Sequence, residues 1–529
     1  MGQESNILDF TKTSPKIFPI LFLSLTVLAL LVRLPQPSAR PMHTDEAINA
    51  YITGKLLAGD TYHYDPRDRH GPILYAVAVP IARLAGAKNL AGLTETSLRL
   101  GPILTGSLTI LLFAALAPEF GLAAALVAAL LWAVAPLPVY YSRYFIHETL
   151  FVAATLGLLT SGWRWLKTGA FPAGLGTGFW AALLIAGKET AVLNLAAAGL
   201  AVGAWLLRER FGRVMLRPRL FAVSGGFIGQ PARRHRPEIE EASPMVRWLG
   251  AAAGLIVMLV VITIFYTWGG NNRHGLADLL NSLPRFVARA GGEGHAKPWW
   301  YYLGLLAGGW SGWALLLLAI VGAAGALKGG DAGAHAGALK VWILYGVAIT
   351  IIYSAIPYKT PWLALNLFLP LVVLAGAGAV TLWELASELT QTQGARPALV
   401  AGAAGLLLLL GHDTSQRVFR HPADENNPYA YAHTGEDLPR LPERLHKIAG
   451  PQSTLAVIDA DPWPLPWYLR SYPRVGYWQP GQNPGRADFY LTSTEAWPAL
   501  KPLLTGWRPE YFGVRPGVLL ILWTRPAPR

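Results

Sequence analysis

Repeated apolar runs of about 20 residues constrain this chain more than any other feature, because a helix of that length crosses roughly 30 Å of hydrocarbon. Hydrophobic residues make up 53% of the 529 positions and charged residues only 14%, against about a quarter in soluble domains. This composition excludes a disordered, collagen-like or soluble nucleic-acid-binding protein. We expect eleven membrane-spanning helices, at roughly 17–34, 97–117, 121–141, 144–163, 172–188, 190–207, 247–268, 300–327, 341–357, 361–384 and 398–411.

The remaining segments define the domain organisation. Residues 1–411 form the predicted transmembrane domain, whose large first outer loop spans 35–96. Within this loop, the short apolar stretch from Gly71 to Ala87 fits a helix lying along the membrane interface. Residues 412–529 suffice for one small α/β domain. Its expected elements are helices at 438–448 and after Pro462, and strands near 454–459, 474–478, 488–492 and 517–524.

The distribution of arginine predicts which loops lie in the cytoplasm. Residues 208–247 hold nine arginines, and cytoplasmic loops carry an excess of Lys and Arg. With eleven spans, the loop 35–96 and the tail 412–529 then lie outside the cytoplasm, as expected for a protein of the plasma (inner) membrane. Because many of the cations behind the net charge of +13 lie in loops between apolar runs, no nucleic-acid partner is implied. The chain has no cysteine, which excludes disulfides and thiolate chemistry.

Two polar motifs lie in the first outer loop. His43-Thr44-Asp45-Glu46 opens it. The two carboxylates either favour the dipole of a helix that begins there, with Thr44 as a cap, or include a general base that deprotonates a hydroxyl. The second motif contains Arg69 and His70. Cations there either contact lipid headgroups or bind an anionic substrate.

Further ionisable residues lie at outer turns between apolar spans. Arg143, His147 and Glu148 follow the third predicted span. They either lock two helices together or form a functional site, because charges at such depth are costly. His147 and Glu148 could also bind a divalent metal together with Asp45 or Glu46, although the spacing of these residues is not typical of a metal site. Single lysines, Lys188 and Lys359, occupy two later turns. Each either extends to the interface or binds phosphate as a point charge.

Taken in order, these motifs resemble the membrane glycosyltransferase C superfamily, in particular its protein O-mannosyltransferase-like (glycosyltransferase family 39-like) group. The bacterial and archaeal family labelled flippase-activity-associated is the most similar. The resemblance covers nearly the whole chain and rests on the segments His43–Glu46, Arg69–Pro72, Ser142–Glu148, Gly187–Thr190 and Tyr358–Trp362, together with Asn427–Thr434 and Trp463–Arg470 in the tail.

The resemblance implies an inverting, hexosyl- or mannosyltransferase-like enzyme. Asp45 would be the catalytic base, with Glu46 in support. The donor would be a polyprenyl-phosphate sugar, and the acceptor a hydroxyl of a glycan, lipid or protein at the outer face of the bilayer. No cofactor is implied other than the possible divalent metal. Substrate and phosphate binding would fall to Arg69, His70, Arg143, His147, Glu148, Lys188 and Lys359.

Two features bear on this implied activity. The Trp-Trp-Asp string of oligosaccharyltransferases is absent, since Trp299-Trp300 is followed by Tyr301, which argues against transfer of a preassembled glycan to asparagine. The alternative function is a non-catalytic lipid-sugar flippase or transporter accessory. A transporter would place ionisable residues toward the bilayer midplane, whereas those of this chain cluster at one predicted face. The clustering favours the enzyme.

Overall fold

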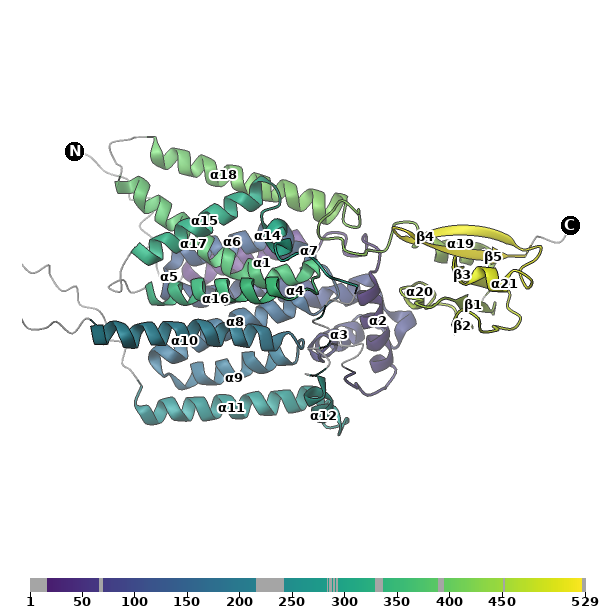
Figure 1. Cartoon of the computed structure of the whole chain (residues 1–529), viewed down its shortest axis with the longest axis horizontal. Coiled ribbons are helices and arrows are strands. Elements are labelled where there is room, and N and C mark those ends of the chain that lie inside the picture. The colour runs from purple at the N-terminus through teal and green to yellow at the C-terminus, as the bar shows by residue number, and fades with distance from the viewer. Residues whose placement is uncertain are drawn as a thin grey trace, which may run out of the picture.

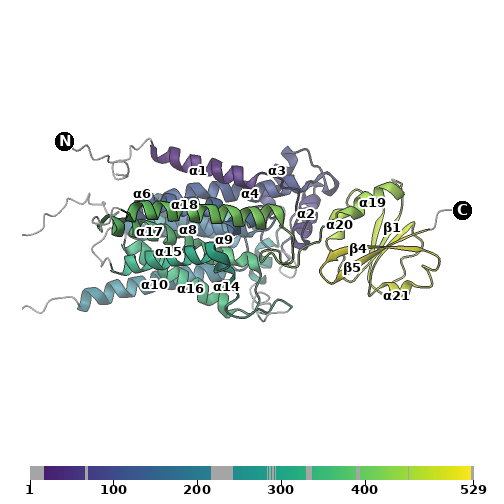
Figure 2. The same ribbon diagram turned by 90° about the horizontal axis from the view of Figure 1, so that it is seen from above.

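The computed structural model describes residues 17–65, 70–215, 242–282, 294–328, 336–388, 394–450 and 452–525, with positions 284, 288 and 291. Every predicted span overlaps a helix in it, although the span predicted at 300–327 divides into α14 (Tyr301–Leu306) and α15. Figures 1 and 2 show these helices side by side along the long axis of the molecule. They are α1 (Ile17–Arg33), α4 (Glu95–Phe113), α6 (Leu122–Val134) with α7 (Pro136–Ser142), α8 (Glu148–Thr168), α9 (Phe171–Ile185), α10 (Ala191–Met215), α11 (Pro244–Tyr266), α15 (Gly309–Lys328), α16 (Ala336–Ala355), α17 (Leu365–Glu388) and α18 (Ala395–Thr414).

Length and composition divide these helices. Within the described residues, seven helices are long and apolar enough to cross a membrane, or eight if α6 and α7, bent by 58° to each other, form one span. The bend occurs where Pro136 begins α7, as expected of a residue that cannot continue a helix ladder. Helices α1 and α9 are shorter apolar helices. The chain is thus a multi-pass membrane protein, while the number of eleven crossings stays a prediction.

Burial within the bundle follows the apolar sequence. α17 is the central helix, and 89% of its most apolar stretch is buried inside the protein. α11 packs on α9 and leaves Leu255, Ile256 and Leu259 exposed. Large apolar side chains on an outer face suit contact with lipid chains rather than water.

The first outer loop folds at one end of the bundle. It forms α2 (Thr44–Leu57), α3 (Ile73–Leu84) and a short 3₁₀ turn, η2 (Leu90–Gly92). α3 corresponds to the predicted interfacial helix. It packs against α4 and buries Leu74, Tyr75 and Ala82, so one of its faces contacts protein.

The tail forms a small α/β domain at the same end as α2, as Figure 1 shows. α18 runs past the predicted boundary to Thr414, and a π-helical turn, η5 (Ser415–Arg420), follows. Of the five strands, β1 is parallel to β2 and β3, whereas β5 is antiparallel to β3 and β4. The sheet order is β2-β1-β3-β5-β4. The elements are α19 (Arg440–Ile448), β1 (Leu455–Ile458), α20 (Leu465–Tyr468), β2 (Val475–Trp478), β3 (Phe489–Ser493), α21 (Trp497–Leu500), β4 (Arg508–Arg515) and β5 (Val518–Thr524).

The predicted helices and strands of the tail are present, and β4 is the strand that the sequence pattern missed. Its sequence, Arg-Pro-Glu-Tyr-Phe-Gly-Val-Arg, contains proline, glycine and charges, which are typical of an edge strand and depleted in central ones. β4 is indeed at the edge of the sheet.

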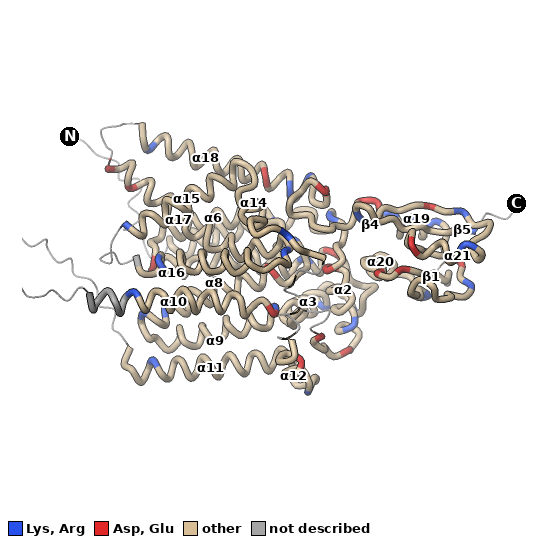
Figure 3. The backbone as a smooth tube through the Cα atoms, in the orientation of Figure 1, with Lys and Arg blue, Asp and Glu red and all other residues tan. Residues whose placement is uncertain are grey.

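Charged residues mark the two ends of the bundle differently. Figure 3 shows most acidic residues at the tail end, whereas the end of α10 and the start of α11, which flank the arginine-rich loop, lie at the opposite end. Most of that loop, 216–241, is outside the described residues. The helix ends that flank the predicted cytoplasmic loop therefore lie at the end of the bundle opposite the tail.

Candidate active site

A cavity of about 400 Å³ is lined by segments that lie at the tail end of the bundle (Figure 1). Helix α2, the turn between α9 and α10, and the segment between α16 and α17 contribute to its wall. Four of the predicted site residues, Asp45, His70, Glu148 and Lys188, line it. Ile48, Asn49, Ile146, Glu189, Thr190, Leu193, His295, Tyr353, Ile356, Tyr358, Thr360, Trp362 and Leu363 complete the lining.

Asp45 lies in the first turn of α2. His43, and not Thr44 as expected, is the N-cap, because its Nδ1 accepts a hydrogen bond from the Asp45 amide at 3.0 Å. The Asp45 side chain is half-buried and borders the cavity. Its carboxylate makes no hydrogen bond or ion pair within 17–65, 70–215 or the other described segments. A carboxylate held at the rim of a cavity and left unpaired can accept a proton from a ligand hydroxyl.

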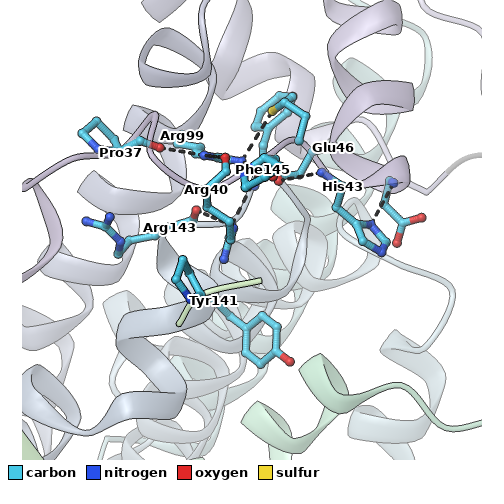
Figure 4. Close-up of polar contacts among 12 residues, drawn as sticks. Pro37, Arg40, His43, Glu46, Arg99, Tyr141, Arg143 and Phe145 are labelled. Carbon is cyan, nitrogen blue, oxygen red and sulfur yellow. Dashed lines mark hydrogen bonds and ion pairs between the residues drawn. The ribbon is translucent and has the colours of Figure 1, made fainter. Parts of the chain in front are cut away.

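Glu46, the next residue, has a different environment. It is 0% exposed, and Arg99 binds both of its oxygens, at 2.8 and 2.7 Å. Oε1 also accepts from the Phe145 amide at 2.8 Å, and Arg40 lies 3.7 Å away. Figure 4 shows Glu46 held between these arginines and His43. Burial alone would raise the pKa of Glu46, but the two arginines and these hydrogen bonds hold it down at about 2.

Glu46 is therefore a structural anchor of α2 rather than a member of the cavity wall. It completes a capping box by accepting from the His43 amide at 3.2 Å. The capping interpretation of the motif thus applies to Glu46. Of the two carboxylates, Asp45 is the one that borders the cavity.

A buried ion pair forms part of the cavity wall. The Lys188 ammonium, 5% exposed, donates to the carboxylate of Glu148. Burial would lower the pKa of Lys188, but the charge and hydrogen bond of Glu148, together with the nearby Glu189 and Tyr358, raise it. An ammonium has three N–H donors, so two remain beside the one that it gives to Glu148.

A second polar pair links the predicted first outer loop to the same turn. His70 Nδ1 lies 3.0 Å from Glu189 Oε2, and the Tyr64 hydroxyl donates to Glu189 Oε1 at 2.5 Å. Burial opposes ionisation of Glu189, but His70 and Tyr64 lower its pKa to about 2. Glu189 was not among the predicted site residues.

Backbone pairing holds His70 in place. The Gly71 amide donates to the Gly187 carbonyl at 3.0 Å, and a Cβ at Gly71 would lie 2.2 Å from the Ala186 carbonyl oxygen. Only glycine permits this approach. His147 holds the same backbone segment: it is buried, and its Nε2 donates to the Gly71 carbonyl at 2.9 Å. Burial keeps the pKa of His147 well below its usual value, so His147 supports the loop as a neutral ring.

Two of the predicted phosphate ligands, Arg143 and Lys359, do not line this cavity. Arg143 donates to the carbonyls of Arg33, Pro35 and Gln36, at 2.5, 2.5 and 3.0 Å. The Lys359 ammonium donates to the carbonyls of Lys297, at 3.4 Å, and Ile356. Arg69 lies outside the described residues. The Arg143 and Lys359 side chains satisfy backbone carbonyls where the chain leaves a helix, which accounts for cations at these turns.

Some residues of the wall gave little signal in the sequence. Asn49 lies one turn after Asp45, and this i, i+4 spacing on α2 is the signal that would have found it. His295 comes from the long segment between α11 and α15. It reaches the cavity because the Lys359 amide donates to its carbonyl at 3.1 Å and Ala296 pairs with Tyr358. A contact across more than 60 residues leaves no local pattern. Among the residues that the structure describes, no three His, Asp or Glu side chains are grouped to hold a metal ion.

Known proteins provide independent comparisons. Residues 79–229 match the family model described as dolichyl-phosphate-mannose-protein mannosyltransferase. A comparison with curated proteins finds no significant match. The crystal structure of ArnT from Cupriavidus metallidurans bound to undecaprenyl phosphate superimposes with a TM-score of 0.61 at 16% identity, covering 96% of this chain and 98% of that one.

The archaeal oligosaccharyltransferase AglB from Archaeoglobus fulgidus, in complex with an inhibitory peptide and a dolichol-phosphate, gives a TM-score of 0.53 at 11% identity and covers 96% and 74%. The arabinofuranosyltransferase AftD from Mycobacteria gives 0.51 at 12% identity and covers 98% and 40%. The chain has the glycosyltransferase C fold. Within this glycosyltransferase C fold, Asp45 and Lys188 come from the first outer loop and a later turn, and meet at one cavity.

Proposed function

We propose that this chain is an inverting membrane glycosyltransferase that moves a sugar from a polyprenyl-phosphate carrier to a hydroxyl acceptor on the extracytoplasmic side of the plasma membrane. The observation that carries the proposal is the Asp45 carboxylate, which borders a cavity whose wall also holds the buried Lys188 ammonium. The cavity offers a base and a cation to one bound substrate pair.

Asp45 acts as the general base in this reaction. The acceptor hydroxyl gives its proton to the Asp45 carboxylate while its oxygen forms a bond to the anomeric carbon of the sugar. The bond between that carbon and the phosphate oxygen breaks, and its electron pair leaves with the polyprenyl phosphate. Loss of a positioned base typically costs on the order of 10²–10⁴ in rate.

Lys188 stabilises the leaving phosphate, whose negative charge grows as the bond breaks. A cation aimed at developing charge lowers the barrier without tightening ground-state binding to the same extent. Glu148 holds the ammonium in place. His70 offers a second donor in the same wall, and Glu189 orients it.

A lipid-linked donor suits the other side chains of the cavity. Ile48, Ile146, Leu193, Ile356 and Leu363 form an apolar part of the lining, next to helices that are long and apolar enough to cross a membrane. Two structures of similar fold were solved with undecaprenyl phosphate and with a dolichol-phosphate. A nucleotide sugar, which is kept in the cytoplasm, has no comparable apolar anchor.

The proposal is tested by supplying donors to the purified protein in lipid nanodiscs. Polyprenyl-phosphate sugars labelled in the sugar, with mannose and glucose among them, are incubated with a cell-envelope acceptor fraction, and release of polyprenyl phosphate is followed. We expect acceptor-dependent release that Asp45→Asn abolishes. Asp60→Asn is the matched control, since Asp60 lies after α2 and does not line the cavity. Efficient transfer from a nucleotide sugar without the lipid carrier contradicts the proposal, and lipid movement without sugar transfer supports the flippase alternative.

A further inference from the structure

The tail domain contacts the chain immediately before Asp45. Met42, three residues earlier, is fully buried. Its amide donates to the hydroxyl of Tyr468, in α20, at 2.9 Å. Its carbonyl accepts from the hydroxyl of Thr434 at 2.7 Å. The backbone N–H and the backbone C=O of Met42 are therefore both held by side chains more than 390 positions away along the chain.

A second connection runs through His43 to the Asp45 backbone. His43 Nε2 lies 3.1 Å from the Tyr431 carbonyl and must donate to it, since a carbonyl only accepts. The same ring accepts the Asp45 amide at Nδ1. Burial lowers the pKa of His43, so the ring stays neutral with its proton on Nε2. The Tyr431 carbonyl thereby fixes the tautomer that caps α2.

The tail is also anchored beside these contacts. Trp467 is 1% exposed, its Nε1 donates to Glu95 at the start of α4 at 3.1 Å, and Arg470 stacks over its ring at 3.7 Å. Trp463 packs against Tyr51 of α2, with ring centroids 5.8 Å apart. Trp467 therefore fills the contact between the domains, and Arg470 covers one face of its ring.

We propose that Tyr468 and Thr434 are positioning residues for Asp45, so that the tail domain sets the geometry of the base without touching the substrate. This inference rests on the proposed function. On its other side the first turn of α2 is held by the pairing of Glu46 with Arg99. Anchored from both sides, the turn holds the backbone of Asp45 in place beside the cavity. A displacement of about 1 Å at a reacting group can cost roughly 10²-fold in rate.

The first test compares Tyr468→Phe and Thr434→Val, which remove one hydroxyl each and keep the volume. We expect each to lower kcat about 10-fold, while KM for the polyprenyl-phosphate sugar and the Kd of polyprenyl phosphate stay within twofold of wild type. Tyr490→Phe is the matched control. Tyr490 is equally buried in the tail, and its hydroxyl bonds Gly485 and Ala487, away from α2. It should turn over like wild type.

A second readout does not depend on activity. Hydrogen exchange of a peptide covering 40–50 should speed up in Tyr468→Phe and Thr434→Val but not in Tyr490→Phe, while exchange in the spans stays unchanged. Unchanged exchange and unchanged kcat in the first two variants overturn the inference. If wild type transfers no sugar yet exchange still rises, the proposed function fails while the contact between tail and α2 stands. If Asp45→Asn is inactive but Tyr468→Phe is fully active, the positioning role alone fails.

Discussion

Asp45 and Glu46 are neighbours in the chain, yet Glu46 is fully buried against Arg99 while Asp45 borders the cavity. Adjacent residues on a helix point about 100° apart, so one turn can present one carboxylate to protein and the next to a substrate. Under the proposed function, Glu46 stabilises the first turn of α2 and Asp45 acts as the base.

Glu46→Gln should lower the stability of the fold more than it lowers the catalytic rate of the molecules that remain folded. Removing the charge leaves Arg99 and Arg40 buried without their carboxylate, which typically costs about 3–5 kcal/mol. We expect a clear drop in the thermal unfolding temperature at pH 7. Any molecules that remain folded should still bind polyprenyl phosphate. An inactive but fully stable Glu46→Gln protein would assign Glu46 to catalysis instead.

The effect of Glu46 should also depend on pH. The pKa of Glu46 is lowered from 4.5 to about 2 in the folded protein, so its stabilisation is fully present above pH 4.5 and is lost as the pH falls toward 2. The difference in unfolding temperature between wild type and Glu46→Gln should therefore shrink between pH 5 and pH 3. A difference that stays constant over this range would mean that the carboxylate charge is not what stabilises α2.

Lys188 should be needed for the lipid phosphate. Lys188→Met alone leaves Glu148 buried and unpaired, so the double variant Lys188→Met/Glu148→Gln separates binding from stability. We expect the double variant to unfold near the wild-type temperature and to bind polyprenyl phosphate roughly 10-fold or more weakly, as loss of a charge-assisted hydrogen bond implies. Wild-type affinity in this variant would remove Lys188 from the proposed site.

Arg143 should affect stability and not donor binding. Its guanidinium donates to three carbonyls at the end of α1, so Arg143→Ala leaves these acceptors unmet. We expect a lower unfolding temperature with an unchanged Kd for polyprenyl phosphate. Weaker lipid-phosphate binding at unchanged stability would instead support the direct role that the sequence motif suggested.

The sidedness of the membrane protein can be measured because the chain has no cysteine. Gln482→Cys, exposed in the tail, should react with an impermeant maleimide in intact cells. Ser243→Cys, exposed at the start of α11, should react only after the membrane is permeabilised. The reverse pattern would place the cavity on the cytoplasmic side and remove the reason for a lipid-linked donor.

Much of the architecture could be predicted from sequence because hydrophobic length and periodicity are local properties. The helices of the bundle and most elements of the tail follow from them. The motif around Asp45 was also visible, because a cap and two acids in succession form a local pattern. The edge strand Arg508–Arg515 was missed because its composition resembles a loop.

The sequence could not predict which of the site residues pair within the protein and which face the cavity. Arg99 lies 53 positions from Glu46 along the chain. The sequence alone could not show that Arg143 binds the end of α1 instead of a phosphate, because this depends on where Pro35 and Gln36 lie in the fold. The tail aromatic residue Trp467 has its partner Glu95 in the membrane domain 372 positions away. Such pairings depend on tertiary packing, which leaves no periodic signal in the chain.

A structure of Asp45→Asn bound to a polyprenyl-phosphate sugar tests the central claim most directly. The amide cannot take the proton, so the donor should remain intact in the cavity. We predict that the phosphate lies within hydrogen-bond distance of the Lys188 ammonium, and that the face of the anomeric carbon opposite the phosphate is turned toward residue 45. A donor whose phosphate binds away from Lys188, or whose anomeric carbon faces away from residue 45, would contradict the mechanism.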